Sequence, residues 1–110
     1  MNRTVIDVVA ERLKDQYSDL SLDEGRVLAH AYVIRNGQSR AVIGNPRTAP
    51  AGYFDSTIGL SFLDSPSLIH EFCEHLVSVG YLTNHDSEIG MVKISGHMIP
   101  VCEQIVNSIF

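Results

Sequence analysis

Residues 65–95 read SPSLIHEFCEHLVSVGYLTNHDSEIGMVKIS, which has the pattern of a helix, a helix end and a two-stranded ribbon, and the rest of the chain is expected to pack around it. Ser65 is a preferred N-cap residue whose hydroxyl can accept from a first-turn amide, and Pro66 suits the first helical position. Apolar residues then recur at helical spacing as far as Val79. Gly80 ends the helix, because glycine adopts the left-handed cap conformation without steric cost.

The residues after Gly80 have the pattern of a β-hairpin. Residues 81–83 form an extended segment, 84–87 are rich in turn-forming residues, and 89–94 form a second strand. Gly90 within that strand marks a bulge or a close approach of backbone. Ser95 and Gly96 break the strand before a last apolar segment. We therefore expect a helix over 65–79, then a hairpin, then a further helix.

The segments LVSVGYLTN (76–84) and MVKISGH (91–97) resemble the C-terminal half of winged-helix domains. In that family a helix ends at a glycine, and a short hairpin, a Ser/Thr-rich break and another helix follow. The resemblance covers about residues 66–106. It implies that the helix enters the major groove of DNA and that the turn at 84–88 contacts the DNA backbone. The contacts it implies would come from Ser67, His70, Glu71, His75, Asn84, His85 and Lys93.

The N-terminal third has the pattern of two amphipathic helices. Apolar residues four apart predict a helix over 4–17. The sequence Ser21-Leu-Asp-Glu24 is a capping-box pattern, in which Ser21 caps the third amide and Glu24 reaches back to the first residue. The helix that it opens should extend to about Arg35. Two such helices with a short joint form a helical hairpin, which can serve as a core or as a dimerisation element.

The middle of the chain predicts a β-hairpin with a long tip. Residues 40–43 and 53–63 have the composition of strands, the second interrupted at Asp55-Ser56, and the loop 44–52 between them is marked by glycines and prolines. Its tip, which carries Arg47, is either a solvated connector or a contact loop for phosphate, nucleic acid or protein. A last helix should run over 99–110, with Pro100 in its first turn. The whole is a single α+β domain in three parts, 1–36, 37–64 and 65–110.

The charge of the chain is acidic and unevenly distributed. The net charge is −5, and residues 64–110 contain six acidic residues against one lysine. Residues 31–63 contain one acidic residue and three arginines, Arg35, Arg40 and Arg47. A nucleic-acid-binding protein is usually basic. These arginines are therefore the only candidate basic patch that could support binding to DNA.

Residues 70–75, His-Glu-Phe-Cys-Glu-His, come close to a metal-binding pattern. Two histidine ligands on one helix need a spacing of four, whereas His70 and His75 are five apart, so surface polar pairs such as His70 with Glu74 are the better interpretation. Cys73 and Cys102 fall on apolar helix faces and are expected to be buried thiols, although a catalytic or redox role stays open. His30 is expected to be a semi-buried histidine with its hydrogen bonds satisfied. We expect no catalytic residues, no metal and no cofactor.

Two functions are close, and the first is preferred because a DNA-binding regulator can take its basic residues from other elements. The resemblance implies a small winged-helix-like transcriptional regulator that binds DNA as a dimer. The acidity, the small size and the lack of a catalytic set favour an acidic protein-interaction module, such as an inhibitor, immunity or anti-defence protein. No apolar run is long enough to cross a bilayer and the N-terminus has no signal-peptide pattern, so a cytoplasmic location is expected.

Overall fold

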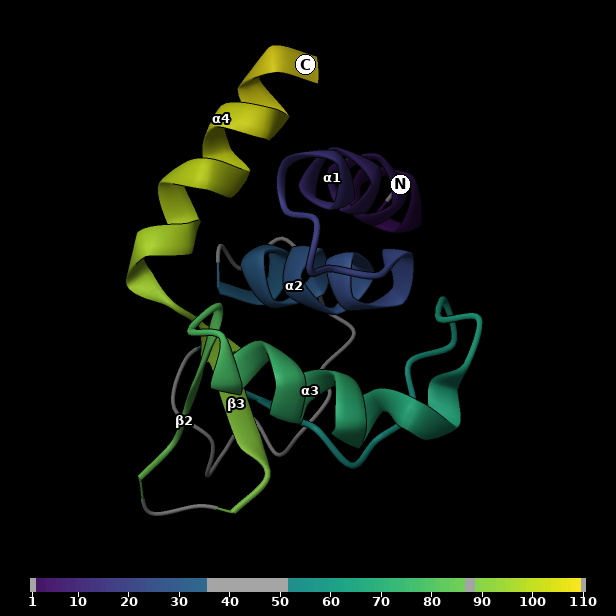
Figure 1. Cartoon of the computed structure of the whole chain (residues 1–110), viewed down its shortest axis with the longest axis vertical. Helices are drawn as coiled ribbons and strands as arrows, with labels where there is room; N and C mark the ends of the chain where they lie inside the picture. The colour runs from purple at the N-terminus through teal and green to yellow at the C-terminus, as the bar shows by residue number, and fades with distance from the viewer. Residues whose placement is uncertain (1, 36–51, 87–88, 110) are drawn as a thin grey trace.

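The computed structural model describes residues 2–35, 52–86 and 89–109, and the expected α+β class is confirmed within them. Figure 1 shows the arrangement. The elements in chain order are α1 (Asn2–Gln16), α2 (Leu22–Arg35), β1 (Phe54–Asp55), the 3-10 helix η1 (Pro66–Leu68), α3 (Ile69–Ser78), β2 (Leu82–Asn84), β3 (Met91–Ile94), the 3-10 helix η2 (Gly96–Met98) and α4 (Ile99–Ile109).

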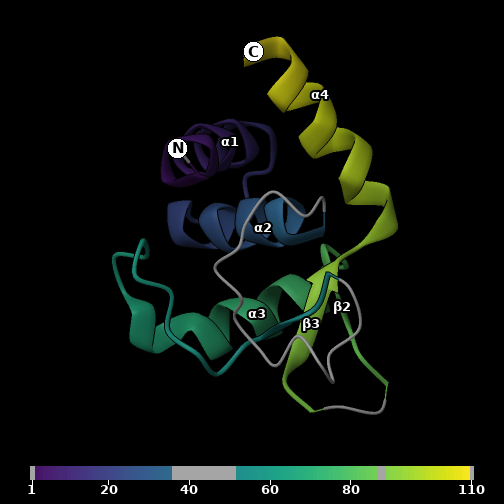
Figure 2. The same cartoon turned by 180° about the vertical axis from the view of Figure 1, so that it is seen from behind.

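The two N-terminal helices form the predicted helical hairpin. Figures 1 and 2 show α2 between α1 on one side and α3 on the other, with α4 running alongside α1 and α2. The approach of α1 to α2 is close, because a Cβ on Gly25 would lie 2.8 Å from the carbonyl oxygen of Ala10. The absence of a side chain at this crossing therefore allows the two backbones to meet.

The capping box at the start of α2 is confirmed. The Ser21 hydroxyl accepts a hydrogen bond from the Glu24 N–H at 3.2 Å, and Glu24 Oε1 accepts one from the Ser21 N–H at 3.0 Å. Both donors would otherwise be unpaired at the helix end. This local exchange fixes where α2 begins and points the second carboxylate oxygen of Glu24 away from the helix start.

The sheet is three-stranded and antiparallel, with the order β1-β3-β2. Val92 at its centre pairs with Phe54 of β1 and with Asn84 of β2. The strand expected over 53–63 was wrong beyond Asp55. The Asp55 carboxylate accepts hydrogen bonds from the Thr57 N–H at 2.8 Å and from its hydroxyl at 2.6 Å, which turns the chain. The expected strand 40–43 lies outside the described residues, and the described partner of β1 is β3.

The helix expected over 65–79 is present as η1 followed by α3, and its two ends differ in how well they were predicted. Gly80 has φ +88°, and the Tyr81 N–H bonds to the Leu76 carbonyl at 2.8 Å, which is a Schellman C-cap. Ser65 is the N-cap residue of η1, as predicted, but its side chain makes no cap hydrogen bond, so the predicted role of its hydroxyl was wrong. The Asp23 carboxylate instead accepts from the N–H groups of Asp64 and Ser65, at 3.1 and 3.2 Å.

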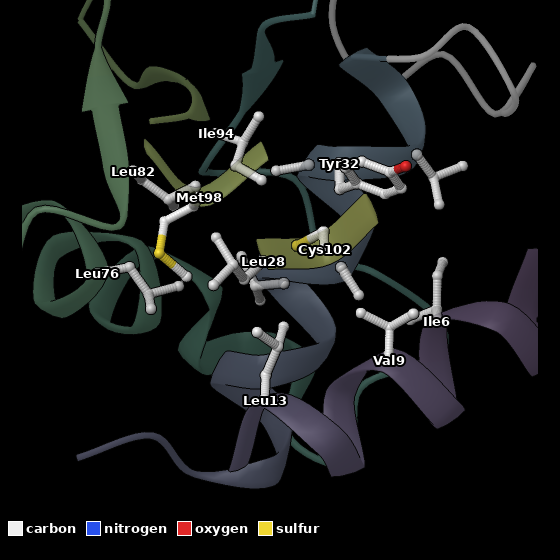
Figure 3. Close-up of a cluster of buried hydrophobic side chains, with 14 of the residues drawn as sticks. Ile6, Val9, Leu13, Leu28, Tyr32, Leu76, Leu82, Ile94, Met98 and Cys102 are labelled. Carbon is white, nitrogen blue, oxygen red and sulfur yellow. The ribbon is translucent and has the colours of Figure 1, made fainter. Parts of the chain in front are cut away.

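The core lies where α2 meets the other helices and the sheet. Figure 3 shows side chains from six elements and η2 packed together, namely Ile6, Val9, Leu13, Leu28, Tyr32, Leu76, Leu82, Ile94, Met98 and Cys102. The predicted last helix is present as α4, with Pro100 in its first turn. In the described ranges no helix is both long and apolar enough to cross a bilayer.

Candidate functional site

A groove of about 480 Å³ lies between α3 and the β2–β3 hairpin. This volume is within the range of ~300–1,000 Å³ that is usual for ligand pockets. One side is formed by α3 and the other by the hairpin and the residue after β1. The lining residues are His70, Cys73, Glu74, Val77 and Ser78 from α3, Asn84, His85, Ile89, Gly90 and Val92 from the hairpin, and Ser56.

The spacing of the α3 residues places them along one stripe of the helix. Positions 70, 73, 74, 77 and 78 follow the i, i+3, i+4, i+7, i+8 pattern, so they share a face and follow the helix axis. The ends of the stripe are eight residue steps apart, which gives a groove about 12 Å long at 1.5 Å per residue. Two backbone bonds brace the facing wall: the His85 N–H donates to the Met91 carbonyl at 2.9 Å across the hairpin, and the Ser56 N–H donates to the Gly90 carbonyl at 2.7 Å.

The floor of the groove is apolar and chemically inert. Cys73 and Val92 are buried and Val77 is partly buried. Burial raises the pKa of the Cys73 thiol to about 12, and burial together with the nearby Glu103 raises that of Cys102 to about 12. Both cysteines are buried free thiols, as expected, and stay protonated at neutral pH. A thiol in this state is a poor nucleophile.

The rim of the groove on the α3 side carries negative charge. His70 Nε2 lies 2.6 Å from Glu74 Oε1, and both side chains are exposed, as predicted for a surface pair. Glu71, which follows His70 on α3, is exposed, and Asp86 is exposed in the hairpin turn. Within the described residues that line the groove there is no lysine or arginine.

Lys93 is the described lysine nearest in sequence to the groove, but it belongs to the other side of the sheet. It follows Val92 on β3, and successive side chains of a strand point to opposite faces. Its ammonium lies 5.0 Å from the centre of the Tyr53 ring, which also contacts the His85 ring edge-on at 4.8 Å. The cation is therefore held on Tyr53 and away from the groove floor.

His75 was predicted to face a ligand, and the structure directs it towards α2. Its Nδ1 makes a short contact with Oε2 of Glu24, the residue whose other oxygen completes the capping box. The contact joins the start of α2 to the middle of α3. The described residues contain no group of three histidine, cysteine, aspartate or glutamate side chains suited to a metal ion.

A second polar network, which sequence reasoning missed, surrounds Arg26. Its guanidinium contacts carboxylates of Asp7 at 3.2 Å, Asp23 at 2.9 Å and Asp64 at 3.0 Å. These come from α1, from α2 and from the segment before η1. The capping-box pattern predicted a local role for Glu24 and no tertiary contact for Asp23. The network instead fixes the start of η1 and α3 against α2, and so positions the groove.

His30 was expected to be semi-buried with its hydrogen bonds satisfied, and both parts of this prediction were wrong. It is 1% exposed, and neither ring nitrogen has a hydrogen-bond partner among the described residues. Its ring centre lies 5.4 Å from that of Phe54 and 5.2 Å from that of Phe62. Burial among these rings lowers the pKa of His30 to about 4.

The remaining predicted contact residues are dispersed. Ser67 is exposed on η1, at the start of the exposed face that continues through Glu71 and Glu74. Arg35 is exposed at the end of α2 and does not line the groove. Arg40 and Arg47 lie outside the described residues. Of the predicted contact residues, the structure therefore brings His70, Asn84 and His85 together at the groove and leaves Arg35 apart from them.

Comparison with protein-family models, with curated proteins and with solved structures finds no match for this chain.

Proposed function

We propose that this protein is a non-catalytic interaction module whose acidic α3–hairpin face binds a basic surface of a protein partner. The observation that carries the proposal is the charge of that face. Glu71 and Glu74 are exposed on α3 and Asp86 is exposed in the hairpin turn. The described Lys93 is engaged with Tyr53 on the opposite side of the sheet. An inhibitor or immunity-type protein would use such a surface.

Electrostatics supports a protein partner over a nucleic acid at this face. Duplex DNA carries one negative charge per ~1.7 Å of its axis, and its affinity for proteins comes largely from neutralised phosphates. The helix that would enter the major groove of DNA is α3, and its two exposed glutamates act against that neutralisation. The same glutamates would attract a basic protein, speed its association and make the complex sensitive to salt.

The test is capture of partners from the source organism by three forms of the full chain. The first is the wild type, and the second is Glu71→Gln with Glu74→Gln. The third, a matched control, is Glu11→Gln with Asp15→Asn, which removes two exposed charges from α1 instead. We expect salt-sensitive partners that are basic to bind the wild type and the control, and to be lost from the α3 variant. Equal capture by all three forms would reject the proposal.

A winged-helix-like transcriptional regulator that binds DNA, as a dimer, is the second candidate. The order of elements favours it, because α3, the cap at Gly80, the hairpin, the break at Ser95 and α4 follow one another as the resemblance implies. This candidate needs positive charge from Arg35, Arg40 and Arg47. Neutralising Glu71 and Glu74 distinguishes the two candidates by sign, since it should weaken binding to a basic protein and strengthen binding to DNA.

A further inference from the structure

We propose that the groove between α3 and the hairpin is an anchor site for one apolar side chain of a short basic segment of the partner. This inference rests on the proposed function and adds the chemistry of the segment that is bound. It follows from three features of the groove, which are its apolar floor, its acidic rim and its length.

The floor offers an apolar surface that protein side chains do not fill. Val77 and the buried Cys73 and Val92 form it, and the protonated thiol of Cys73 behaves as a small apolar group. Ile89, on the hairpin wall, is fully exposed and would be covered by an occupant. Interfaces concentrate their binding energy where an apolar anchor enters such a pocket and excludes water.

The rim specifies the residues on either side of the anchor. Glu74 lines the groove, and Glu71 is exposed on α3 three residues before it, just outside the lining. Both carboxylates can therefore meet lysine or arginine side chains that flank the anchor. Asn84 lines the facing wall, and its amide can both donate to and accept from a peptide backbone. An acidic segment or a phosphodiester would instead place negative charge beside Glu74.

The length of the groove limits the segment. The stripe from His70 to Ser78 is about 12 Å long, and an extended chain advances ~3.3 Å per residue. Three or four extended residues therefore fit. The recognised unit is a basic residue, an apolar residue and a second basic residue.

The experiment is a titration of the isotope-labelled full chain, followed by amide chemical shifts, with blocked peptides. The first is Lys-Leu-Lys. Lys-Ala-Lys lacks the anchor, and Glu-Leu-Glu reverses the charge. We expect Lys-Leu-Lys to shift the amides of Cys73, Val77, Ile89 and Gly90. Replacing leucine with alanine removes three buried carbons, so Lys-Ala-Lys should bind about tenfold more weakly or worse, and Glu-Leu-Glu should not bind.

A groove-filling variant and its control complete the test. Ser78→Trp places a large ring at the groove mouth, and Ser108→Trp makes the same change at the end of α4. The two serines are matched, since each is exposed and its hydroxyl donates to the carbonyl three residues earlier, at 2.7 and 2.8 Å. We expect Ser78→Trp to abolish the shifts and Ser108→Trp to retain them, with both variants showing the wild-type amide dispersion of a folded chain.

The outcomes separate this inference from the proposed function. Equal binding of Lys-Leu-Lys and Lys-Ala-Lys, with shifts confined to Glu71 and Glu74, would overturn the anchor site and leave the acidic face intact. The absence of groove shifts up to roughly 10 mM peptide would also overturn it. Groove shifts caused by a single-stranded oligonucleotide in place of the peptide would overturn it in favour of nucleic acid. Anchored binding of Lys-Leu-Lys with unchanged partner capture by the Glu71/Glu74 variant would support the site and reject the proposed function.

Discussion

The carboxylate of Asp23 accepts a hydrogen bond at 3.2 Å from the backbone N–H of Ser65, 42 residues further along the chain. The same carboxylate accepts from the Asp64 N–H and contacts Arg26. One side chain of α2 thus satisfies the backbone at the start of η1 and neutralises a partly buried cation. The position of α3, and with it one wall of the groove, depends on this tertiary contact.

Replacing Asp23 with alanine should therefore be strongly destabilising. The change leaves two N–H groups without their acceptor and removes one partner of Arg26, and we expect a loss of about 2–4 kcal/mol in the free energy of unfolding. Urea denaturation measures it. Asp15→Ala, at an exposed position on α1, is the control and should change stability by less than about 0.5 kcal/mol. Similar values for the two variants would show that the cap contributes little.

His75 and His70 should differ in their contribution to stability although both lie on α3. His75→Leu leaves Oε2 of Glu24, on a side chain that is 10% exposed, without its partner, and should cost about 1–3 kcal/mol. His70→Leu removes only an exposed pair with Glu74 and should cost less than about 0.5 kcal/mol. Thermal or urea unfolding of both variants checks this. An equal effect would mean that the contact between α2 and α3 is not stabilising.

His30 should make the fold sensitive to acid. Its pKa is about 4 in the folded chain against an ordinary 6.5, so the unfolded chain takes up a proton first as the pH falls. The stability is complete above pH 6.5, declines as the pH falls towards 4 and then levels off. The shift of 6.5 − 4 = 2.5 corresponds to about 3 kcal/mol.

His30→Leu tests this pH dependence because it replaces the titratable ring with an apolar side chain of similar size between Phe54 and Phe62. The difference in unfolding free energy between the variant and the wild type should grow by about 3 kcal/mol in favour of the variant between pH 7 and pH 4. Carboxylates that titrate in this range are common to both proteins and cancel in the difference. A difference independent of pH would show that the folded chain accommodates a protonated His30.

The crossing of α1 and α2 should not accept a methyl group at position 25. In Gly25→Ala the new carbon would meet backbone of Ala10 at 2.8 Å, so one helix has to move, and we expect a loss of about 1–3 kcal/mol. Gly96→Ala is the control, because its Cβ would meet no atom of the described chain within 4 Å. That variant should be neutral or stabilised by up to about 1 kcal/mol. A neutral Gly25→Ala would contradict the close packing.

The features that sequence reasoning predicted correctly depend on neighbouring residues. The Ser21–Glu24 capping box and the cap at Gly80 each involve residues within a few positions of one another, so their patterns are visible in the chain. A contact between neighbouring residues also explains why the strand predicted over 53–63 ends at Asp55. Residues 53–63 have a strand-like composition, but the Asp55 side chain bonds to Thr57 and turns the chain.

The features that were missed depend on residues far apart in sequence. Ser65 has the right identity for an N-cap, but Asp23 reaches its N–H group from another helix and the hydroxyl is not used. His75 has the exposure pattern of a ligand-facing residue, but Glu24 lies 51 residues away and binds it. The groove itself was not predicted. Sequence reasoning named three of its polar residues, His70, Asn84 and His85, whereas the floor of Cys73, Val77 and Val92 requires the sheet to pack beside α3.

If the acidic α3–hairpin face binds protein and not DNA, the chain should not bind labelled random-sequence duplex DNA at low salt, as measured by fluorescence anisotropy. Non-specific DNA binders reach dissociation constants of about 10⁻⁴–10⁻⁶ M. We expect the wild type to show no binding in that range and the Glu71→Gln, Glu74→Gln variant to bind no more weakly than the wild type. Micromolar binding by the wild type that weakens steeply with salt would contradict the account and favour the regulator.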